Sequence, residues 1–285
     1  MLGIVLSTSL AACYQFRRNI MGTLDRDESL SKRYSRQIAT RHERLYGRGY
    51  QGPGSQEVFD HLSSKLRWKS EFVVLDVGSG LGGDAFRIAR RFGASVTGLD
   101  ASSEMVEVAK ERLVSDGPGD ADIEFVCGNV LDSNVLVSAK FDVVWTRDAG
   151  AFLTVEEKAR AWERLFHAQP PEGQVLLTDY CVSAGPVNEV FISRMHAWGQ
   201  HPITFSDYEE ILRAAGYVNI VSEDRTPDLI ASQREGLTLL QEEEESLRVE
   251  FGSSVYEALM DRWERKVSHS TSGQLRWLAL TAERP

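Results

Sequence analysis

The chain has 285 residues, of which 42% are hydrophobic and 26% charged, and its formal net charge at pH 7 is −10. This composition is typical of a globular protein, and the length suits one large α/β domain with appended elements. The excess of acidic side chains argues against a nucleic-acid partner. Since no run approaches the roughly eighteen apolar residues of a membrane span, we expect no stable membrane insertion.

The N-terminal segment has an unusual composition. It is apolar and small up to Cys13 and then becomes basic, but no Lys or Arg precedes the apolar part, as a secretory signal requires. There are two alternatives for this segment. It is a short mitochondrial presequence, or it lies upstream of the working start codon at Met21. We expect residues 1–25 to be a leader or a disordered N-terminus and residues 26–285 to form the folded domain. Three cysteines without metal-ligand spacing predict no metal site and a reduced compartment, so the expected location is cytoplasmic.

Strand and helix patterns alternate through the first two thirds of the chain. A charged helical segment at 27–46 and a Gly- and Pro-rich break at 47–55 come first, and the two together are a candidate lid. The alternation that follows predicts a parallel sheet with helices on both faces. The predicted strands lie at 72–76, 94–99, 123–127, 141–145 and 174–178, and the predicted helices at 57–66, 85–92, 103–113 and 155–168.

The last third departs from this alternation. Residues 182–203 predict one or two further lid helices. Beyond them the patterns predict a helix to Ala215 with Thr204 or Ser206 as its cap, and a strand at 217–222. We expect the chain to finish with a long helix at 228–251, a helix at 253–266 and a last strand at 275–282.

The stretch from Phe72 to Asp84, FVVLDVGSGLGGD, predicts a strand, a glycine turn and the start of a helix. Glycine is needed in such a turn because a Cβ would block the turn geometry and the close approach of backbone to a ligand. The N–H groups at the start of the helix are then free to bind a polar or anionic group. Asp100 closes the next strand, where an acid can accept both hydroxyl groups of a ribose. The stretch therefore predicts a nucleotide-type ligand.

The glycines from Gly78 to Gly83 fit two ligands, S-adenosyl-L-methionine as G-x-G-x-G and a dinucleotide as G-x-G-x-x-G. Asp76 favours S-adenosyl-L-methionine, because a carboxylate there faces a cationic sulfonium and amino end and would repel a pyrophosphate. Asn129, after the third strand, can bond the adenine edge. S-adenosyl-L-methionine is therefore the predicted cofactor. A nicotinamide dinucleotide is the alternative, and a glycine turn that binds nothing is the third possibility.

Polar residues follow the predicted strands at the edge where such sheets bind ligands. They are Asp76, Asp100, Asn129, Arg147, Asp148, Asp179 and Tyr180. This ring is the predicted site.

Several strings make the chain recognisable from about residue 34 to its end. They are YGRGY at 46–50, TRDA at 146–149, TDYC at 178–181, EDRT at 223–226, and WERK at 263–266 followed by QLRW at 274–277. Together with the glycine turn, they resemble the phosphoethanolamine N-methyltransferases, within the class I S-adenosylmethionine-dependent methyltransferases. The resemblance implies a Rossmann-like α/β fold, with a mostly parallel seven-stranded sheet, a C-terminal antiparallel strand and a helical lid. It also implies methylation of phosphoethanolamine or its methylated forms in phosphocholine synthesis, a part of phospholipid metabolism.

The same resemblance implies roles for single residues. Tyr34 and Asp148 are expected to be catalytic, Tyr34 by closing over the cofactor and Asp148 by holding the amine. The expected substrate-binding residues are Tyr180, Arg194 and Lys266. The expected cofactor-binding residues are Tyr34, Gln51, Gly52, Asp76, Gly78, Gly80, Asp100, Ala101, Asn129, Val130 and Arg147.

The chain departs from the family at the chemistry itself. A family histidine that pairs with the active-site tyrosine is Phe152 here, a serine is Gly52, and a tyrosine of the first helix is His42. Three lid residues that hold the phosphate in the family fall on Arg194, Trp198 and Gln200 by ungapped counting. Two other functions therefore stay open: methylation of another small amine, acid or hydroxyl, and a catalytically weak S-adenosylmethionine-binding regulator. In each case the expected partner is a small molecule and the expected state a monomer.

Overall fold

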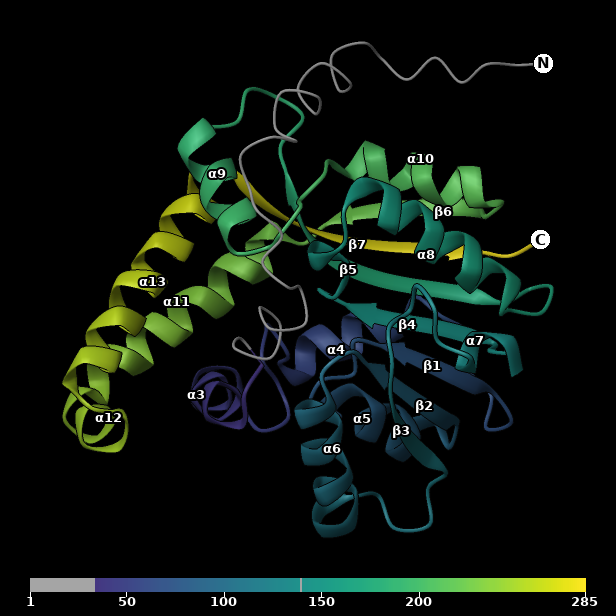
Figure 1. The fold of residues 1–285 in the computed structure, drawn as a ribbon, viewed down its shortest axis with the longest axis horizontal. Coiled ribbons are helices and arrows are strands. Elements are labelled where there is room, and N and C mark those ends of the chain that lie inside the picture. Colours follow the sequence, from purple (N-terminus) through teal and green to yellow (C-terminus); the bar gives the residue numbers. More distant parts are fainter. Residues whose placement is uncertain (1–33, 139) are drawn as a thin grey trace.

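The computed structural model describes residues 34–138 and 140–285 (Figure 1). The predicted leader at 1–25 and the start of the lid predicted at 27–55 lie outside these residues. A seven-stranded sheet forms the centre, in the order β3-β2-β1-β4-β5-β7-β6. Its strands are β1 (Val73–Val77), β2 (Ser95–Asp100), β3 (Ile123–Cys127), β4 (Val143–Arg147), β5 (Gln174–Val182), β6 (Val218–Asp224) and β7 (Leu275–Glu283).

The sheet is mostly parallel. β1 pairs in parallel with β2 and β4, β2 with β3, and β4 with β5. β7 runs antiparallel to both β5 and β6, between which it lies. The fold class predicted from the sequence, a Rossmann-like sheet with a C-terminal antiparallel strand, is thereby confirmed.

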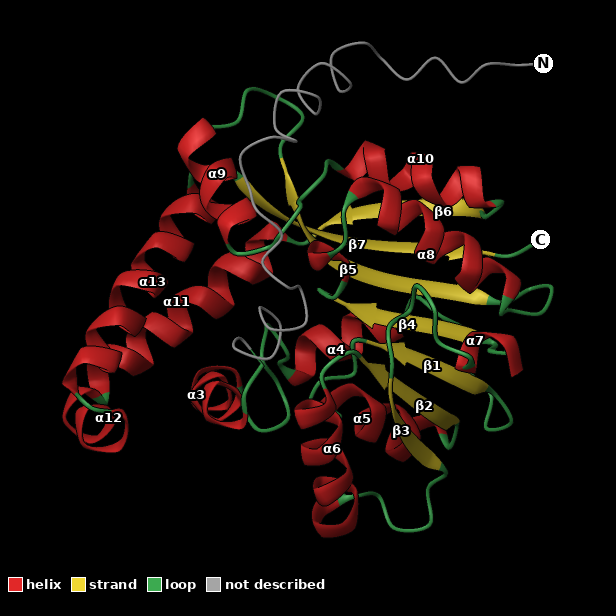
Figure 2. Ribbon diagram, viewed as in Figure 1, coloured by secondary structure: helices red, strands yellow, loops and turns green. Residues whose placement is uncertain are grey.

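Helices cover both faces of the sheet (Figure 2). α4 (Gln56–Ser63), α5 (Gly83–Phe92) and α6 (Ser103–Asp116) share one buried apolar cluster with the strands. α7 (Val135–Ser138), α8 (Val155–His167) and α10 (Phe205–Ala215) share the cluster on the other face. Thr154 and Thr204 begin α8 and α10 with complete capping boxes, and Thr204 is one of the two caps that the sequence offered for α10.

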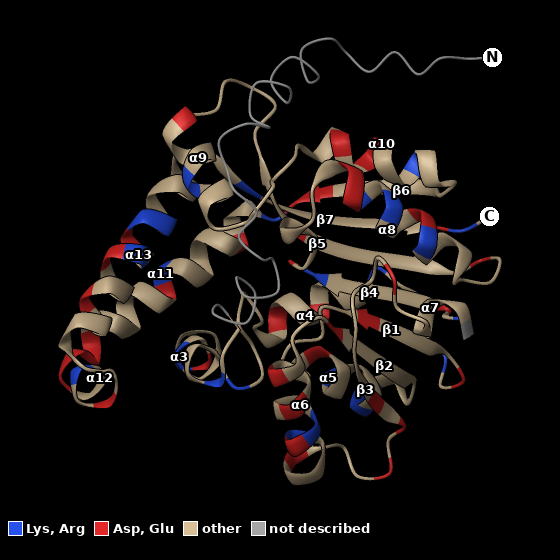
Figure 3. Cartoon of the chain, in the orientation of Figure 1, with Lys and Arg blue, Asp and Glu red and all other residues tan. Residues whose placement is uncertain are grey.

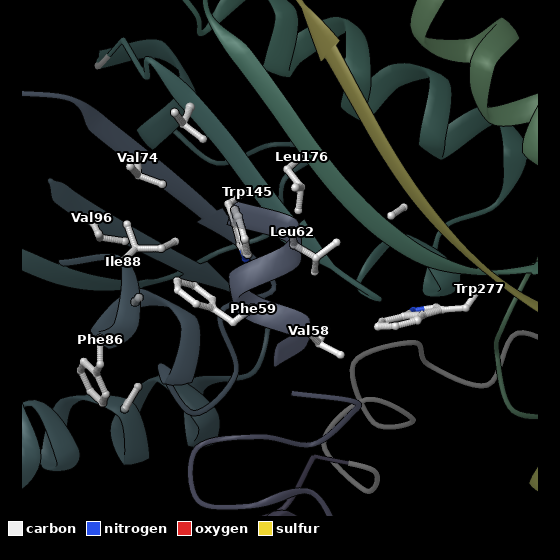
Figure 4. Close-up of a cluster of buried hydrophobic side chains, with 14 of the residues drawn as sticks. Val58, Phe59, Leu62, Val74, Phe86, Ile88, Val96, Trp145, Leu176 and Trp277 are labelled. Carbon is white, nitrogen blue, oxygen red and sulfur yellow. The ribbon is translucent and has the colours of Figure 1, made fainter. Parts of the chain in front are cut away.

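The core beneath α4 shows how a short helix is held on the sheet (Figure 4). Phe59 and Leu62 lie three residues apart on one helix face and are buried. The ring of Phe59 packs against Trp145 of β4 with centroids 5.7 Å apart. This contact fixes the segment before β1, from which the lid loop at 47–55 approaches the strand ends.

A group of helices stands beside the carboxyl edge of the sheet (Figure 1). It consists of α3 (Arg36–Tyr46), α9 (Glu189–Ala197), α11 (Thr226–Glu242), α12 (Glu244–Phe251) and α13 (Ser253–Thr271). The single helix predicted at 228–251 is therefore wrong, because α11 ends and α12 begins on either side of Glu243, which is paired with Arg44 of α3. None of the helices within residues 34–138 and 140–285 combines the length and apolar character needed to cross a membrane.

Candidate active site

A cavity of about 630 Å³ opens at the carboxyl ends of the parallel strands, with α3 and α13 closing its far side. Apart from Arg194 and Asp179, all of the residues predicted for the site line it. They are Tyr34, Gln51, Gly52, Asp76, Gly78, Gly80, Asp100, Ala101, Asn129, Val130, Arg147, Asp148, Tyr180 and Lys266. The structure thus gathers residues that are far apart in the sequence around one space.

The turn between β1 and α5 forms part of the cavity wall without side chains. Gly78 and Gly80 have φ angles of 75° and 51°, in the region that favours glycine. A Cβ on Gly78 would lie 2.4 Å from the Cβ of Ala149. The Gly78 N–H donates to the carbonyl of Leu99 at 2.7 Å, which ties the turn to β2.

Asp100 lies at the end of β2 and faces this turn. Its Oδ2 accepts from the N–H of Gly80 and its Oδ1 from the N–H of Ser102, both at 2.8 Å. Burial raises the pKa of the Asp100 carboxyl, and these two donors act against that rise. The carboxylate therefore has a fixed orientation at the mouth of the glycine turn.

Asp76 is the most deeply buried acid of the cavity wall, with 4% of its surface exposed. Burial first, and then repulsion from Asp84, raise the pKa of its carboxyl well above the usual value, although Arg147 opposes the rise. Within the described residues, no hydrogen bond reaches this carboxyl group. A buried acid with a raised pKa favours a cationic ligand, because a nearby positive charge stabilises the ionised carboxylate that burial destabilises.

Several polar atoms in the wall are buried without a hydrogen-bond partner among the described residues, and three of them come from the loop at 47–55, the glycine turn and the end of β4. These three are Oε1 of Gln51, Oγ of Ser79 and Nε of Arg147. Leaving such groups unpaired is costly, so an arrangement of this kind is expected where a polar ligand supplies the missing partners.

Asp84 was not predicted from the sequence, yet it organises this end of the cavity. Its Oδ1 accepts from the Tyr50 hydroxyl at 2.9 Å, and its Oδ2 accepts from Trp145 Nε1 at 3.0 Å and from Arg147 Nη1 at 3.1 Å. The ion pair with Arg147 is about nine-tenths buried. The only sequence signal was an acid in the first turn of a helix, a position that usually serves the helix dipole.

Asp148 follows β4 with a φ angle of 59°. Its Oδ1 accepts from the Thr178 hydroxyl at 2.9 Å and from Trp277 Nε1 at 2.8 Å. Burial raises the pKa of the Asp148 carboxyl, while Arg147 and the two hydrogen bonds act to lower it. The carboxyl is thus anchored through one oxygen, and Oδ2 lies nearer the Gly52 backbone, where an added Cβ would be 3.3 Å away.

The other end of the cavity is basic and comes from α13, which contributes Arg262, Arg265 and Lys266 to the lining. Lys266 Nζ donates to the Tyr46 hydroxyl at 3.0 Å and lies 4.0 Å from the ring centroid of Trp263. Burial and repulsion from Arg262 hold the pKa of Lys266 well below its usual range, although Asp148 opposes this shift. An anion bound here would stabilise the protonated, positively charged form of Lys266.

His42 lies beside these cations and lines the same cavity. Burial, and then the charges of Lys266 and Arg262, lower the pKa of His42 to about 3. The side chain at the position of the family tyrosine is therefore neutral at physiological pH.

Two residues lie differently from their predicted positions. Arg194 is exposed, because α9 turns Phe191 and Met195 towards the cavity and leaves Arg194 on its outer side. Asp179 was expected in the polar ring, but successive residues of β5 face opposite ways, so Tyr180 lines the cavity and Asp179 does not. Asp179 instead accepts from the Tyr208 hydroxyl, and burial raises its pKa to about 7.

Phe152 occupies the position of the family histidine and contacts Tyr34. Their ring centroids are 5.7 Å apart and the planes meet at 80°, an edge-to-face arrangement. The tyrosine and its neighbour are therefore still in contact, but the phenylalanine side chain offers neither donor nor acceptor.

Comparisons with known proteins agree with this geometry. Residues 74–173 match the family profile described as "Methyltransferase domain". Phosphoethanolamine N-methyltransferase 1 of Zea mays is 30% identical over 237 residues, which make up 83% of this chain and 46% of that protein. Phosphoethanolamine N-methyltransferase of Plasmodium falciparum is 28% identical over 237 residues, 83% of this chain and 87% of that protein. The chain spans about half the length of the plant relative.

Among solved structures, the fold is similar to phosphoethanolamine N-methyltransferase 2 of Haemonchus contortus, solved with phosphomonomethylethanolamine and S-adenosylhomocysteine. The TM-score is 0.85 at 24% identity, over 92% of this chain and 60% of that chain. The chain is thus similar to methyltransferases in its fold and, over residues 74–173, in its sequence profile. The chain resembles the phosphoethanolamine N-methyltransferases, so the resemblance predicted from its motifs is confirmed.

The glycine turn provides a test of this local structure. Gly78→Ala is expected to lower the free energy of unfolding by about 2–5 kcal/mol, since a left-handed φ costs a non-glycine residue about 1–2 kcal/mol and crowding adds about 1–3. Urea unfolding measures the change. Gly185→Ala is the control, because a Cβ there meets nothing within 4 Å. Equal effects of the two substitutions would contradict the turn geometry.

Proposed function

We propose that this chain is an S-adenosylmethionine-dependent N-methyltransferase that acts on phosphoethanolamine or its methylated forms, and so serves phosphocholine synthesis. The observation that carries the proposal is a single cavity with an acid, Asp148, on one side and three basic side chains on the other, on α13. A phosphobase has a cationic amine at one end and an anionic phosphate at the other. Its two charges match the two sides of the cavity.

The glycine turn is the proposed cofactor site. Asp100 would accept from the ribose, Asn129 would meet the adenine, and Asp76 would face the cationic end. The unpaired Gln51 Oε1, Ser79 Oγ and Arg147 Nε fit a polar group of this size, since each needs a partner. When bound, S-adenosylmethionine supplies a methyl group activated by its sulfonium. The residues that line the turn have only to bind and orient it.

Asp148 is the proposed partner of the amine. A primary amine is mostly protonated at neutral pH, so its first methylation needs a proton acceptor. With Oδ1 held by Thr178 and Trp277, Oδ2 is the oxygen that accepts the ammonium hydrogen bond and then the proton, directly or through one water. Burial raises the pKa of this carboxyl and makes it a better base. Tyr34 is proposed to close the cavity and exclude water.

Arg262 is proposed as a phosphate ligand that the sequence did not predict. The lid position that is arginine in the family is Trp198 here, and the guanidinium of Arg262 lies 5.6 Å from the centre of the Trp198 ring. Both residues line the cavity. Arg262 of α13, next to Lys266, therefore supplies the positive charge that the lid lacks. Tyr180 completes this side of the cavity.

Methylation of another small amine, acid or hydroxyl is the second candidate. Phe152 and Gly52 favour it, because both positions lack the polar side chain that the family carries there. A catalytically weak regulator that binds the cofactor is the third. Formation of S-adenosylhomocysteine from phosphoethanolamine, ethanolamine and glycine-type amines separates the three candidates. Within the same proposal the chain is a cytoplasmic monomer, with no nucleic-acid partner and no stable membrane insertion.

The buried acid Asp76 gives the cofactor site a pH dependence. In the free protein its pKa is raised, so at low pH the carboxyl is protonated. A cationic ligand favours the ionised form, so binding releases a proton and the affinity for S-adenosylmethionine rises with pH up to the raised pKa. Asp76→Asn is expected to remove this proton release and to weaken binding by about ten- to a hundredfold.

Calorimetry in two buffers of different ionisation enthalpy measures both effects. Asp100 and Asp148 remain in the variant, so the difference between the proteins isolates Asp76. Glu156→Gln, an exposed change on α8, is the control for loss of one charge. Unchanged proton release in Asp76→Asn, or binding of NAD in place of S-adenosylmethionine, would contradict the site.

The basic side of the cavity is tested by phosphate dependence. Lys266→Met and Arg262→Met are each expected to raise the KM for phosphoethanolamine by about ten- to a hundredfold, because each removes a charge-assisted hydrogen bond. The affinity for S-adenosylmethionine should not change. Lys110→Met, on the exposed side of α6, is the control. An equal loss with ethanolamine, which has no phosphate, would show that the two residues only support the fold.

Phe152→His tests the side chain that contacts Tyr34. A histidine adds a donor and acceptor beside the tyrosine, so kcat with phosphoethanolamine should rise, while the methylated phosphobases should gain less because they have fewer protons to lose. Phe152→Leu, which keeps an apolar side chain, should not gain. Steady-state kcat with the three phosphobases decides the outcome. No activity on any of them in either wild type or Phe152→His would remove the phosphobase function.

A further inference from the structure

A second cavity of about 450 Å³ lies on the other side of the loop after α3, between that loop, α5 and α6. Its lining contains five arginines and one carboxylate. The arginines are Arg48, Arg87, Arg90, Arg91 and Arg112, and the acid is Asp116. The net charge of the whole chain is −10, so this cluster is a positively charged region on a protein that is negatively charged overall. Figure 3 shows basic segments in the loop after α3 and on α6.

Three of these arginines are neutralised by carboxylates. Arg48 pairs with Asp116, Arg91 with Asp60, and Arg112 with Glu43 at 2.5 Å. The other two, Arg87 and Arg90 on α5, form no ion pair within the described residues, and their hydrogen bonds go only to backbone carbonyls. They hold the excess positive charge of the cavity.

Arg87 and Arg90 keep donors available for a ligand. Arg87 Nη1 donates to the carbonyls of Gly54 at 2.7 Å and Ser55 at 3.2 Å, and Arg90 Nη2 to that of Asp116 at 3.3 Å. A guanidinium has five N–H donors. Within the described residues, the structure gives no hydrogen bond from Nε or Nη2 of Arg87, or from Nε or Nη1 of Arg90.

The floor of the cavity is aromatic and holds Arg87 in place. Its guanidinium lies 4.4 Å from the ring centroid of Tyr50 and 5.6 Å from that of Phe59. Both rings are buried. A cation held over a ring and by two carbonyls loses little conformational freedom when it binds, which favours affinity.

We propose that this cavity is a second binding site, for the phosphate or pyrophosphate group of an anionic ligand, with Arg87 and Arg90 as its principal donors. Planar guanidinium groups match phosphate oxygens in pairs, and two such groups one turn apart on α5 can hold neighbouring oxygens. The site is separate from the proposed phosphate end of the active site, because Arg262, Arg265 and Lys266 line the first cavity and not the second. It does not depend on methyl transfer.

The test is binding of inorganic pyrophosphate to the full chain, measured by calorimetry at low and at physiological salt. In Arg87→Gln/Arg90→Gln, affinity should fall about tenfold for each guanidinium removed. Arg213→Gln/Arg234→Gln, two exposed arginines on α10 and α11, is the charge-matched control and should bind as wild type does. In Lys266→Met, the pyrophosphate binding that Arg87→Gln/Arg90→Gln loses should remain, which separates this site from the proposed active site. Arg90→Gln alone, at an exposed position, guards against a folding defect and should still show its tenfold loss.

A second arm distinguishes a soluble ligand from a lipid headgroup. It measures retention on vesicles of neutral lipid with and without an anionic phosphate lipid. Pyrophosphate binding that the double variant loses supports a soluble ligand. Retention on the anionic vesicles that the double variant loses, without pyrophosphate binding, supports the same phosphate site with a lipid headgroup as its source. No difference between wild type and the double variant in either arm overturns the proposal.

Discussion

The active-site cavity depends on one buried carboxylate, that of Asp84 at the start of α5. A carboxylate removed from water is costly unless donors satisfy it. Here Tyr50 from the lid loop, and Trp145 and Arg147 from β4, supply those donors. Because they come from separate elements, the glycine turn, the central strand and the lid loop are held in one mutual arrangement. Tyr50 also lines the second, arginine-rich cavity. The wall of that cavity therefore depends on the same buried carboxylate.

The C-terminal part of the chain completes the cavity in two ways. The antiparallel strand β7 pairs with β5 so that Trp277 lies opposite Tyr180, and the Trp277 indole donates to Asp148. The acid proposed to hold the amine is therefore oriented by a core residue of the last strand. α13, which precedes β7, brings Lys266 to the basic side. A fold made of the parallel strands alone would keep the cofactor turn and lose both of these features.

Sequence alone predicted what local chemistry determines. The glycine turn requires glycine at Gly78, and Thr204 caps α10 by bonding to a residue three positions away, so these elements were predicted correctly. Most of the residues that the family resemblance implied for the site line the cavity. What escaped depends on contacts between distant segments: the three donors on Asp84, the approach of Arg262 to the lid, and the end of α11 near Arg44. The outward turn of Arg194 depends on how α9 packs, which counting along the sequence cannot give.

This chain has Phe152 where the family has a histidine. A histidine can both pack against the tyrosine and take up a proton, whereas a phenylalanine can only pack. An edge-to-face contact with Tyr34 contributes about 0.5–1.5 kcal/mol beyond burial and does not vary with pH, whereas a histidine titrates near neutrality. Under the proposed function, closure at this position therefore adds no group that titrates near neutrality, and Asp148 is the proposed proton acceptor. Burial is the first cause of the raised pKa of Asp148. The proposed closure by Tyr34, which excludes water, would act in the same direction and raise the pKa of Asp148 without placing a charge beside it.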